Sequence, residues 1–438
     1  MNYALLRAFG QAFRTPDLRK KMLFVLFIVL LFRLGSAIPA PGVSEKNIHA
    51  CLVQVTGGNS ANVYTLINLF SGGALLKLSI LALGIMPYIT SSIIIQLLVV
   101  VIPRLEKLKQ EGQSGQAKLT QYTRYLTIGL AILQSSAFVA LARTPGQIFQ
   151  GCNTPIIPND GWPVILTIVL TMTAGTAIIM WLGELITDRG IGNGMSILIF
   201  TQIAARFPSE LNSIRQTKGL FTFLMVILVG GVIIAAIVFV EQAQRRIPVQ
   251  YAKRMIGRRM YGGTSTYLPL KVNQAGVIPV IFASSLLYIP SLLTRVWSGN
   301  LGFTQFVTNY LSPNGHLTYL LLYAALIIFF TFFYVAITFN PDEVAENMKK
   351  YGGFIPGIRP GRPTAEYLTY ILSRITVPGA TYLAVVAVIP EAALSIIGSS
   401  QQFPFGGTSV LIIVGVGLDT VKQIESQLML RNYEGFLR

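Results

Sequence analysis

The sequence predicts an all-α polytopic membrane protein, and three observations support this fold class. Of the 438 residues, 53% are hydrophobic and only 12% are charged, with a mean hydropathy of +0.60. Soluble domains carry about 25% charged residues, roughly twice that fraction. Apolar segments approaching the length of a membrane helix, about 20 residues, recur along the whole chain. We therefore expect transmembrane helices throughout and no separate soluble domain.

The first element is expected after a basic leader, residues 1–21, which we interpret as a cytosolic amphipathic segment. The apolar run that follows predicts a first span over residues 22–38. Small residues at 36–40 also fit a signal-peptide cleavage region, but the many later spans favour a retained helix. Arg33 falls near the outer end of this span, where its long side chain can reach the interface.

The second span, within residues 68–104, is interrupted. Gly72-Gly73 and Gly84 divide it into a short apolar piece and a longer helix with Pro87 in its first turn, where proline is tolerated. Irregular backbone at membrane depth requires cover by protein or access to water. A kinked spanning helix with glycine-rich packing is one interpretation; the other, which we favour, is a half-helix folded into a cavity beside a helix that lines it.

Eight further spans are predicted, which makes ten and places both termini on one side of the membrane. They are residues 122–142, 162–182, 194–206, 221–240, 272–293, 317–338, 370–390 and 407–418. The fifth and the tenth are short and flanked by glycine, at corresponding positions of two halves, residues 22–206 and 207–420. Such a correspondence indicates five-plus-five repeats around a central pathway. Residues 421–438 form a predicted cytosolic tail.

The charge distribution predicts the orientation. The net charge is +17, and 26 of the 34 Lys and Arg residues lie on the side of the termini. The net charges of the two sides are +13 and +4. The positive-inside rule then places both termini and the long loops in the cytoplasm.

Two of those loops, residues 241–271 and 339–369, are too elaborate for simple connectors. Both are basic, and both interleave the charges with apolar residues and with Gly and Pro turn signals; residues 261–271 also carry strand signals. A basic face alone would set the topology and contact anionic lipid. Ordered, projecting loops favour the docking of a partner instead, and a ribosome would supply acidic phosphate.

Catalytic chemistry is not indicated. The spans contain almost no Asp, Glu or His, and Glu184 and Glu241 fall at span ends. The sequence contains no P-loop, H-E-x-x-H motif or nucleophile elbow, so we predict neither an enzyme nor a cofactor. Cys51 and Cys152 form no metal-binding spacing, and we favour free thiols over a disulfide. An ion-coupled secondary solute transporter, which usually keeps ionisable groups within the membrane, is the main alternative. A scaffold for membrane assembly is another.

Motifs along nearly the whole chain resemble the SecY/Sec61-alpha family, the protein-conducting channels of the general secretory pathway, and especially its bacterial branch. They are Arg33-Leu-Gly-Ser-Ala-Ile-Pro-Ala-Pro-Gly42, Phe70-Ser-Gly-Gly-Ala74, Ala82-Leu-Gly-Ile-Met-Pro-Tyr-Ile89, Gln121-Tyr-Thr-Arg-Tyr125, Thr187-Asp-Arg-Gly-Ile-Gly-Asn-Gly194, Gln244-Arg-Arg246, Gly257-Arg-Arg259, Leu270-Lys-Val-Asn273, Pro356-Gly-Ile-Arg359 and Phe405-Gly-Gly-Thr-Ser409. The resemblance implies ten helices in two inverted five-helix halves around an hourglass pore.

The resemblance also implies site residues. A plug half-helix, about residues 66–77, would close the outer funnel with Ser71, Gly72, Gly73, Ala74, Leu75, Leu76 and Lys77. Six apolar side chains would form a pore ring, in which Met195 replaces the commoner branched residue: Ile85, Ile89, Met195, Ile199, Ile281 and Ile412. Two i,i+4 pairs among them each share one helix face, although such spacing is usually plain core packing.

The remaining implications concern the lateral gate and the partners. Small or polar residues on the second and seventh spans would belong to a gate that releases apolar segments into lipid: Thr90, Gln96, Ser284 and Ser285. A motor, SecA, or a ribosome would dock on the cytosolic loops and tail through Lys253, Arg254, Arg258, Arg259, Arg359 and Tyr433. SecE and SecG would be companion subunits, YidC and SecDF further associates, and the bacterial plasma membrane the location.

Overall fold

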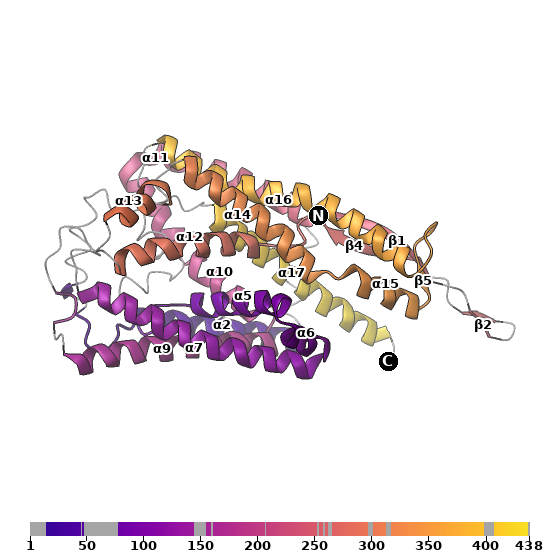
Figure 1. The fold of residues 1–438 in the computed structure, drawn as a ribbon, viewed down its shortest axis with the longest axis horizontal. Helices are drawn as coiled ribbons and strands as arrows, with labels where there is room; N and C mark the ends of the chain where they lie inside the picture. Colours follow the sequence, from indigo (N-terminus) through magenta and orange to yellow (C-terminus); the bar gives the residue numbers. More distant parts are fainter. Residues whose placement is uncertain are drawn as a thin grey trace.

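The fold is that of a computed structural model (Figure 1). It describes residues 15–44, 46–47, 78–143, 155–158, 161–205, 207–251, 254–256, 259–261, 265–296, 301–311, 317–397 and 407–436. The predicted plug half-helix and both cysteines lie outside these residues. The described part is mostly helical, which confirms the predicted fold class.

The N-terminal half contributes six helices to the described chain. They are α2 (Pro16–Ala37), α5 (Met86–Val101), α6 (Pro103–Gln110), α7 (Gln113–Arg143), α9 (Trp162–Arg189) and α10 (Gly194–Ala204). Pro87 lies in the first turn of α5, as the sequence predicted. The chain bends by 101° between α5 and α6, at the residue before Pro103, because a proline disfavours helical backbone in the residue that precedes it.

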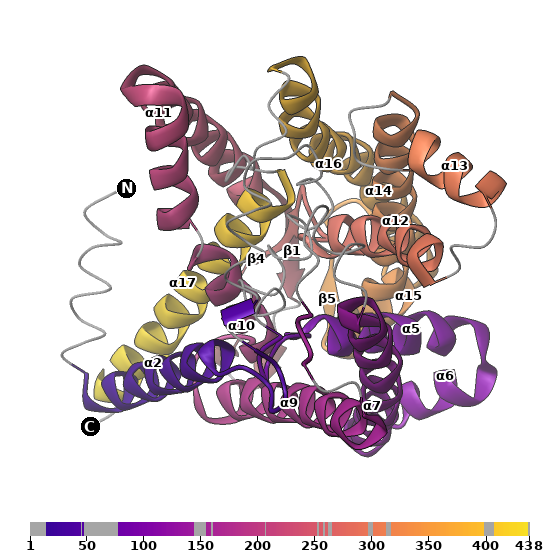
Figure 2. The same ribbon diagram turned by 90° about the vertical axis from the view of Figure 1, so that its left-hand side faces the viewer.

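Seven helices follow in the C-terminal half. They are α11 (Phe207–Gln242), α12 (Ile278–Val296), α13 (Leu301–Tyr310), α14 (Leu317–Thr338), α15 (Pro341–Lys350), α16 (Arg362–Ile397) and α17 (Gly407–Phe436). Viewed along the long axis, most helices of the two halves form separate groups, with α10 near the middle and α17 reaching α2 (Figure 2). The last helix continues well beyond its predicted end at residue 418, into the tail.

Every predicted span overlaps one of these helices. The helices that meet the length and hydropathy of a typical membrane span, however, are fewer than the ten predicted spans. Within the described residues, five helices are long and apolar enough to cross a membrane, and the bent pair α5–α6 would make a sixth. Shorter apolar helices occur at α10 and within α12. The count of ten spans therefore remains a prediction.

A small sheet joins the two loops of the C-terminal half that the sequence predicts to be cytosolic. Strands β1 (Gln244–Tyr251) and β4 (Ser265–Lys271) pair antiparallel, and β5 (Gly353–Phe354) adds to the other edge of β1. The pair β2 (Arg254–Ile256) and β3 (Arg259–Tyr261) projects beyond this sheet (Figure 1). We call β1 to β4 the arm. The strand signals that the sequence showed at 261–271 are confirmed by β4.

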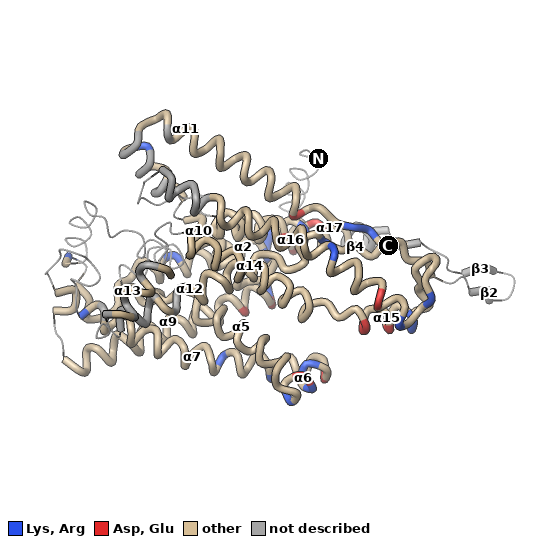
Figure 3. Tube along the Cα trace, turned by 45° about the horizontal axis from the view of Figure 1, so that its top comes forward, with Lys and Arg blue, Asp and Glu red and all other residues tan. Residues whose placement is uncertain are grey.

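Charged residues of the described chain gather at the arm end of the molecule, near α6, α15 and the sheet (Figure 3). The helix bodies between the two ends are nearly free of them, which fits a bilayer around the middle of the bundle. Many of the exposed residues on α2 and α11 are large and apolar, including Leu26, Phe27, Leu228 and Phe239. Such surfaces require lipid or partner helices to cover them.

Candidate functional site: an apolar waist with a gate and an arm

The six residues proposed for the pore ring lie together in one hydrophobic cluster. Ile85 and Ile412 are 1% exposed, Ile281 is 5% exposed and Ile199 is 8% exposed. Ile89 and Met195 are partly buried and pack against the same cluster. Four elements supply these side chains, namely α5 with the residue before it, α10, α12 and α17. Residues far apart in sequence therefore form a single apolar junction between the two halves.

The backbone before α5 holds Ile85, one of the residues proposed for the pore ring, in place. Ser79 forms an isolated antiparallel bridge with Pro39, and Ile80 N donates to Ile38 O at 3.0 Å. Gly84 has φ +59°, a left-handed conformation that favours glycine, and directly precedes Ile85. The described residues that precede α5 are thus held against the end of α2 at the level of the cluster.

The position of α10 depends on a cap and on close packing with α9. Asn193 Oδ1 accepts hydrogen bonds from Met195 N at 3.1 Å and Ser196 N at 3.5 Å, which is a typical N-cap. A Cβ on Gly194 would collide with the carbonyl oxygen of Gly183, so the two helices touch backbone to backbone. Met195 Sδ lies against Gly183, so the long flexible thioether has a glycine surface to pack on.

The four proposed gate residues lie on α5 and α12, which contact each other. Thr90 Oγ1 donates to Met86 O at 3.0 Å, and Ser284 Oγ donates to Ile281 O at 3.0 Å. Gln96 Nε2 is 3.5 Å from Ser92 Oγ, and Ser285 Oγ is buried without a partner among the described residues. The polar groups with a partner bond within their own helices, so no hydrogen bond between these residues holds α5 to α12.

A different contact connects the two halves at the arm end. Lys109 Nζ, on α6, donates to Ile337 O near the end of α14 at 3.4 Å. The last carbonyl groups of a helix lack partners within the helix, and the C-terminus carries a partial negative charge, so an ammonium group is favourable there. No local sequence pattern indicates this contact, because the two residues are 228 positions apart.

The base of the arm is fixed by polar groups from three elements. Asn273 is 3% exposed, and its Nδ2 donates to Glu241 Oε1 at 2.5 Å and to Gly276 O at 3.1 Å. Lys271 Nζ is 3.4 Å from Asp419 Oδ1 on α17. The turn held by Asn273 explains why the predicted span from residue 272 begins as a helix only at Ile278.

The proposed docking residues lie at the tip and sides of the arm end. Arg254 and Arg259 belong to β2 and β3, and Arg359 is exposed on the turn after β5. Thr364 Oγ1 donates to the carbonyl oxygen of Arg359 at 2.8 Å and so orders that turn. Tyr433 falls near the end of α17. Lys253, Arg258 and the plug residues Ser71 to Lys77 lie outside the described residues.

The comparisons with known proteins decide the family. The SecY family model matches residues 79–421. Curated relatives named protein translocase subunit SecY, from Streptomyces coelicolor and Mycobacterium tuberculosis, are each 62% identical over 99% of this chain and 100% of theirs.

The chain belongs to the SecY family.

Solved structures agree at the level of the fold. A protein-conducting channel matches with a TM-score of 0.63 at 18% identity, covering 93% of this chain and 91% of that one. Sec61 in the canine ribosome-channel complex from the endoplasmic reticulum matches with a TM-score of 0.60, also at 18% identity, with the same coverage. The SecY family fold therefore accounts for the two-halved arrangement of helices around the apolar waist.

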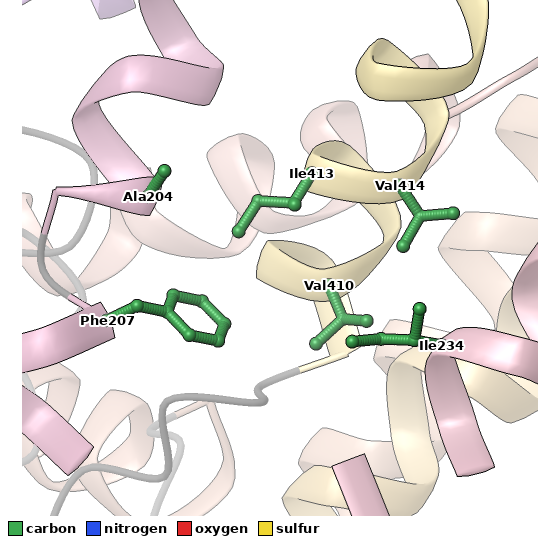
Figure 4. Close-up of a pocket in the computed structure, with 6 residues that line it drawn as sticks. All are labelled: Ala204, Phe207, Ile234, Val410, Ile413 and Val414. Carbon is green, nitrogen blue, oxygen red and sulfur yellow. The ribbon is translucent and has the colours of Figure 1, made fainter. Parts of the chain in front are cut away.

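A cavity lies beside the waist of this SecY family member. Its volume is about 230 Å³, and apolar side chains of α10, α11 and α17 line it: Ala204, Phe207, Ile234, Val410, Ile413 and Val414 (Figure 4). Ile413 directly follows Ile412, which is proposed for the pore ring, so free space adjoins the helix that carries this residue. Helices next to such a void lose fewer packing contacts when they shift.

Sequence reasoning missed an ion pair between helices of the N-terminal half of this SecY fold. Arg124 on α7 donates through Nε and Nη2 to the two carboxylate oxygens of Glu184 on α9, both at 2.8 Å. Such bidentate geometry is specific to arginine. The sequence analysis named the two residues separately, Arg124 in a family motif and Glu184 at a span end.

Among the described residues, no group of three His, Cys, Asp or Glu could hold a metal ion.

Proposed function

We propose that this protein is the central channel subunit of a general secretory translocon. It conducts unfolded secretory polypeptides across the membrane and releases hydrophobic segments sideways into lipid. The observation that carries the proposal is the meeting of six apolar side chains, from helices of both halves, in one cluster at the junction of the halves. The names of the curated relatives, protein translocase subunit SecY, support the same function.

The ring explains how such a channel avoids leaking at rest. An apolar constriction resists wetting, so water and ions do not pass while the waist is narrow. A translocating chain can displace the side chains, because they offer it no hydrogen bonds that would hold it tightly. The proposed plug half-helix, about residues 66–77, would add a second closure on the outer side.

Lateral release needs a seam between the halves that can open. The proposed seam runs between α5 and α12, whose polar gate residues bond internally rather than to one another. Opening the seam therefore breaks none of those hydrogen bonds, and apolar segments can partition into the bilayer through it.

The driving force is proposed to come from outside, from a SecA motor or a translating ribosome on the arm end. Exposed basic groups there, such as Arg359, suit acidic or phosphate-bearing surfaces. SecE and SecG are the proposed companion subunits, with YidC and SecDF as further associates and anionic lipid around the basic face. The channel itself would catalyse no reaction.

The proposed location is the bacterial plasma membrane, with ten spans in two halves, residues 22–206 and 207–420, and both termini in the cytoplasm. The cytosolic position of the arm follows from the positive-inside rule. The alternative function that the sequence left open, an ion-coupled solute transporter, would need ionisable groups at mid-membrane. The cluster at the waist instead consists of apolar residues.

Reconstitution tests the proposal directly. The chain, with its companion subunits, is placed in vesicles with SecA, ATP and an unfolded secretory precursor, and protected precursor is measured after protease treatment. We expect ATP-dependent protection, and none in vesicles without the chain. Absence of protection in the complete system, with each component active in a separate assay, would overturn the proposal. Vesicle uptake of radiolabelled solutes tests the transporter alternative.

A further inference from the structure

One polar side chain is buried beside the apolar waist without a function in the account above. Gln202 lies on α10, three residues after the ring residue Ile199 and seven after Met195. Positions i, i+4 and i+7 share one face of a helix, so Gln202 continues the stripe of the two ring residues. The side chain is only 1% exposed.

Among the residues that the structure describes, the buried amide nitrogen of Gln202 has no hydrogen-bond partner. It packs on the backbone that leads into the ring, because a Cβ on Gly84 would lie 2.6 Å from Nε2. Gly84 directly precedes the ring residue Ile85. The residues nearest to Gln202 along α10, Leu198, Ile199 and Ile203, are buried members of the same apolar cluster.

An unpaired buried donor raises the free energy of the conformation that buries it. Buried polar groups in native structures are nearly always paired, and each exception needs an explanation. When such a donor leaves water without a replacement hydrogen bond, the equilibrium between its buried and its hydrated conformation shifts by roughly fivefold to roughly a hundredfold against the buried conformation. The conformation that bears this cost is the narrow waist, because both Gln202 and Gly84 adjoin ring residues.

We infer that Gln202 is a gating residue of the channel, which disfavours the closed waist until its amide finds an acceptor. When the ring residues separate, Nε2 gains access to water or to the backbone carbonyl groups of an extended polypeptide. An extended chain has unpaired carbonyl groups along its length, so an amide donor suits any client regardless of its sequence. This inference rests on the proposed channel function and adds to it a residue that sets the balance between closed and open.

The test replaces Gln202 with Met, which keeps a similar unbranched shape and removes the amide. Open probability is measured in planar bilayers, with a synthetic signal peptide as the opening agent, and the thermal midpoint of unfolding is measured on the same preparation. We expect Gln202→Met to reduce the ratio of open to closed time by at least about fivefold, with no fall in the thermal midpoint. Gln202→Leu should act in the same direction.

The matched control is Thr176→Val on α9, because Thr176 is also buried, at 2% exposure, but its hydroxyl is paired with Met172 O at 3.2 Å. Its open probability should equal that of the wild type. An unchanged or increased open probability in both Gln202 variants would overturn the inference, as would an equal reduction in the control. Failure of both Gln202 variants to fold, with a folded control, would assign the amide a structural role and overturn it as well. A wild-type protein that never opens would instead count against the channel function itself.

Discussion

The apolar ring makes a prediction that separates sealing from ordinary packing. Ile281 and Ile237 are both buried isoleucines, 5% and 0% exposed, but Ile281 belongs to the cluster at the waist and Ile237 to the core of the C-terminal half. Truncation of either to alanine should cost about 2–5 kcal/mol of stability, because each removes buried carbons and leaves a cavity. The effect on ion leak, in contrast, should differ between them.

The size of the leak follows from the carbons removed from the constriction. Isoleucine to alanine deletes three carbons, and burial of each is worth about 0.8 kcal/mol, so wetting of the waist becomes about 2.4 kcal/mol less costly. That difference corresponds to about a fiftyfold longer wetted time in the resting channel. Ile281→Ala should therefore leak strongly, and Ile237→Ala should leak no more than the wild type.

The assay is resting conductance in planar bilayers, with thermal unfolding recorded to match the two variants in stability. A fiftyfold change is far outside the variation between preparations. Equal leak from the two alanine variants would mean that loosened packing, rather than a lost seal, lets ions through. No leak from Ile281→Ala, in a protein that still folds, would remove this residue from the ring and refute the reasoning from the shared cluster.

Three further predictions concern the arm end and the contact between the halves. Arg359→Glu should slow motor-driven export severalfold in vesicles and leave thermal stability unchanged. The control Arg362→Glu should slow export less, because Arg362 is already paired with Glu366. Equal slowing by the two variants would count against a specific docking role of Arg359. Lys109→Met should raise the open fraction of the gate about two- to fivefold, because it removes a contact worth about 0.3–1 kcal/mol. The open fraction is measured from the distance between labels on α6 and α14, and an unchanged distance distribution would contradict the prediction. Asn273→Leu should lower the free energy of unfolding by about 2–4 kcal/mol in a thermal unfolding assay, since it leaves the half-buried carboxylate of Glu241 without its donor. A loss below about 0.5 kcal/mol would show that the hydrogen bond between Asn273 and Glu241 is not needed.

Local patterns predicted most of the helices because a membrane helix depends on its own residues. Length, hydropathy and proline position place α5, α14 and the start of α17 correctly. The ring residues were a different case. Spacing alone did not distinguish them from plain core, and the family resemblance suggested them before the structure brought them together.

The pairing of distant segments was not predictable from local patterns. The β1–β5 pair joins Gln250 to Phe354, about a hundred positions apart, and each two-residue stretch of it looks like ordinary loop. The sequence analysis did not single out Gln202 either, because the partners of a side chain depend on distant segments. A single polar residue on an apolar helix usually forms a hydrogen bond with one of them. The structure shows that the amide nitrogen of Gln202 has no partner among the described residues.

The arm and the waist are connected by a short and well-anchored piece of chain. Val272 N donates to Ala243 O at 3.0 Å, which closes the base of the arm, and the helix that carries Ile281 begins six residues later. Gly379 on α16 packs so closely on this base that a Cβ there would lie 2.5 Å from Val272 O. A partner that rotates the arm must therefore move α12 with it or break the Asn273 contacts. Because α12 supplies both a ring residue and the proposed gate hydroxyls, motion of the arm and opening of the waist are expected to occur together.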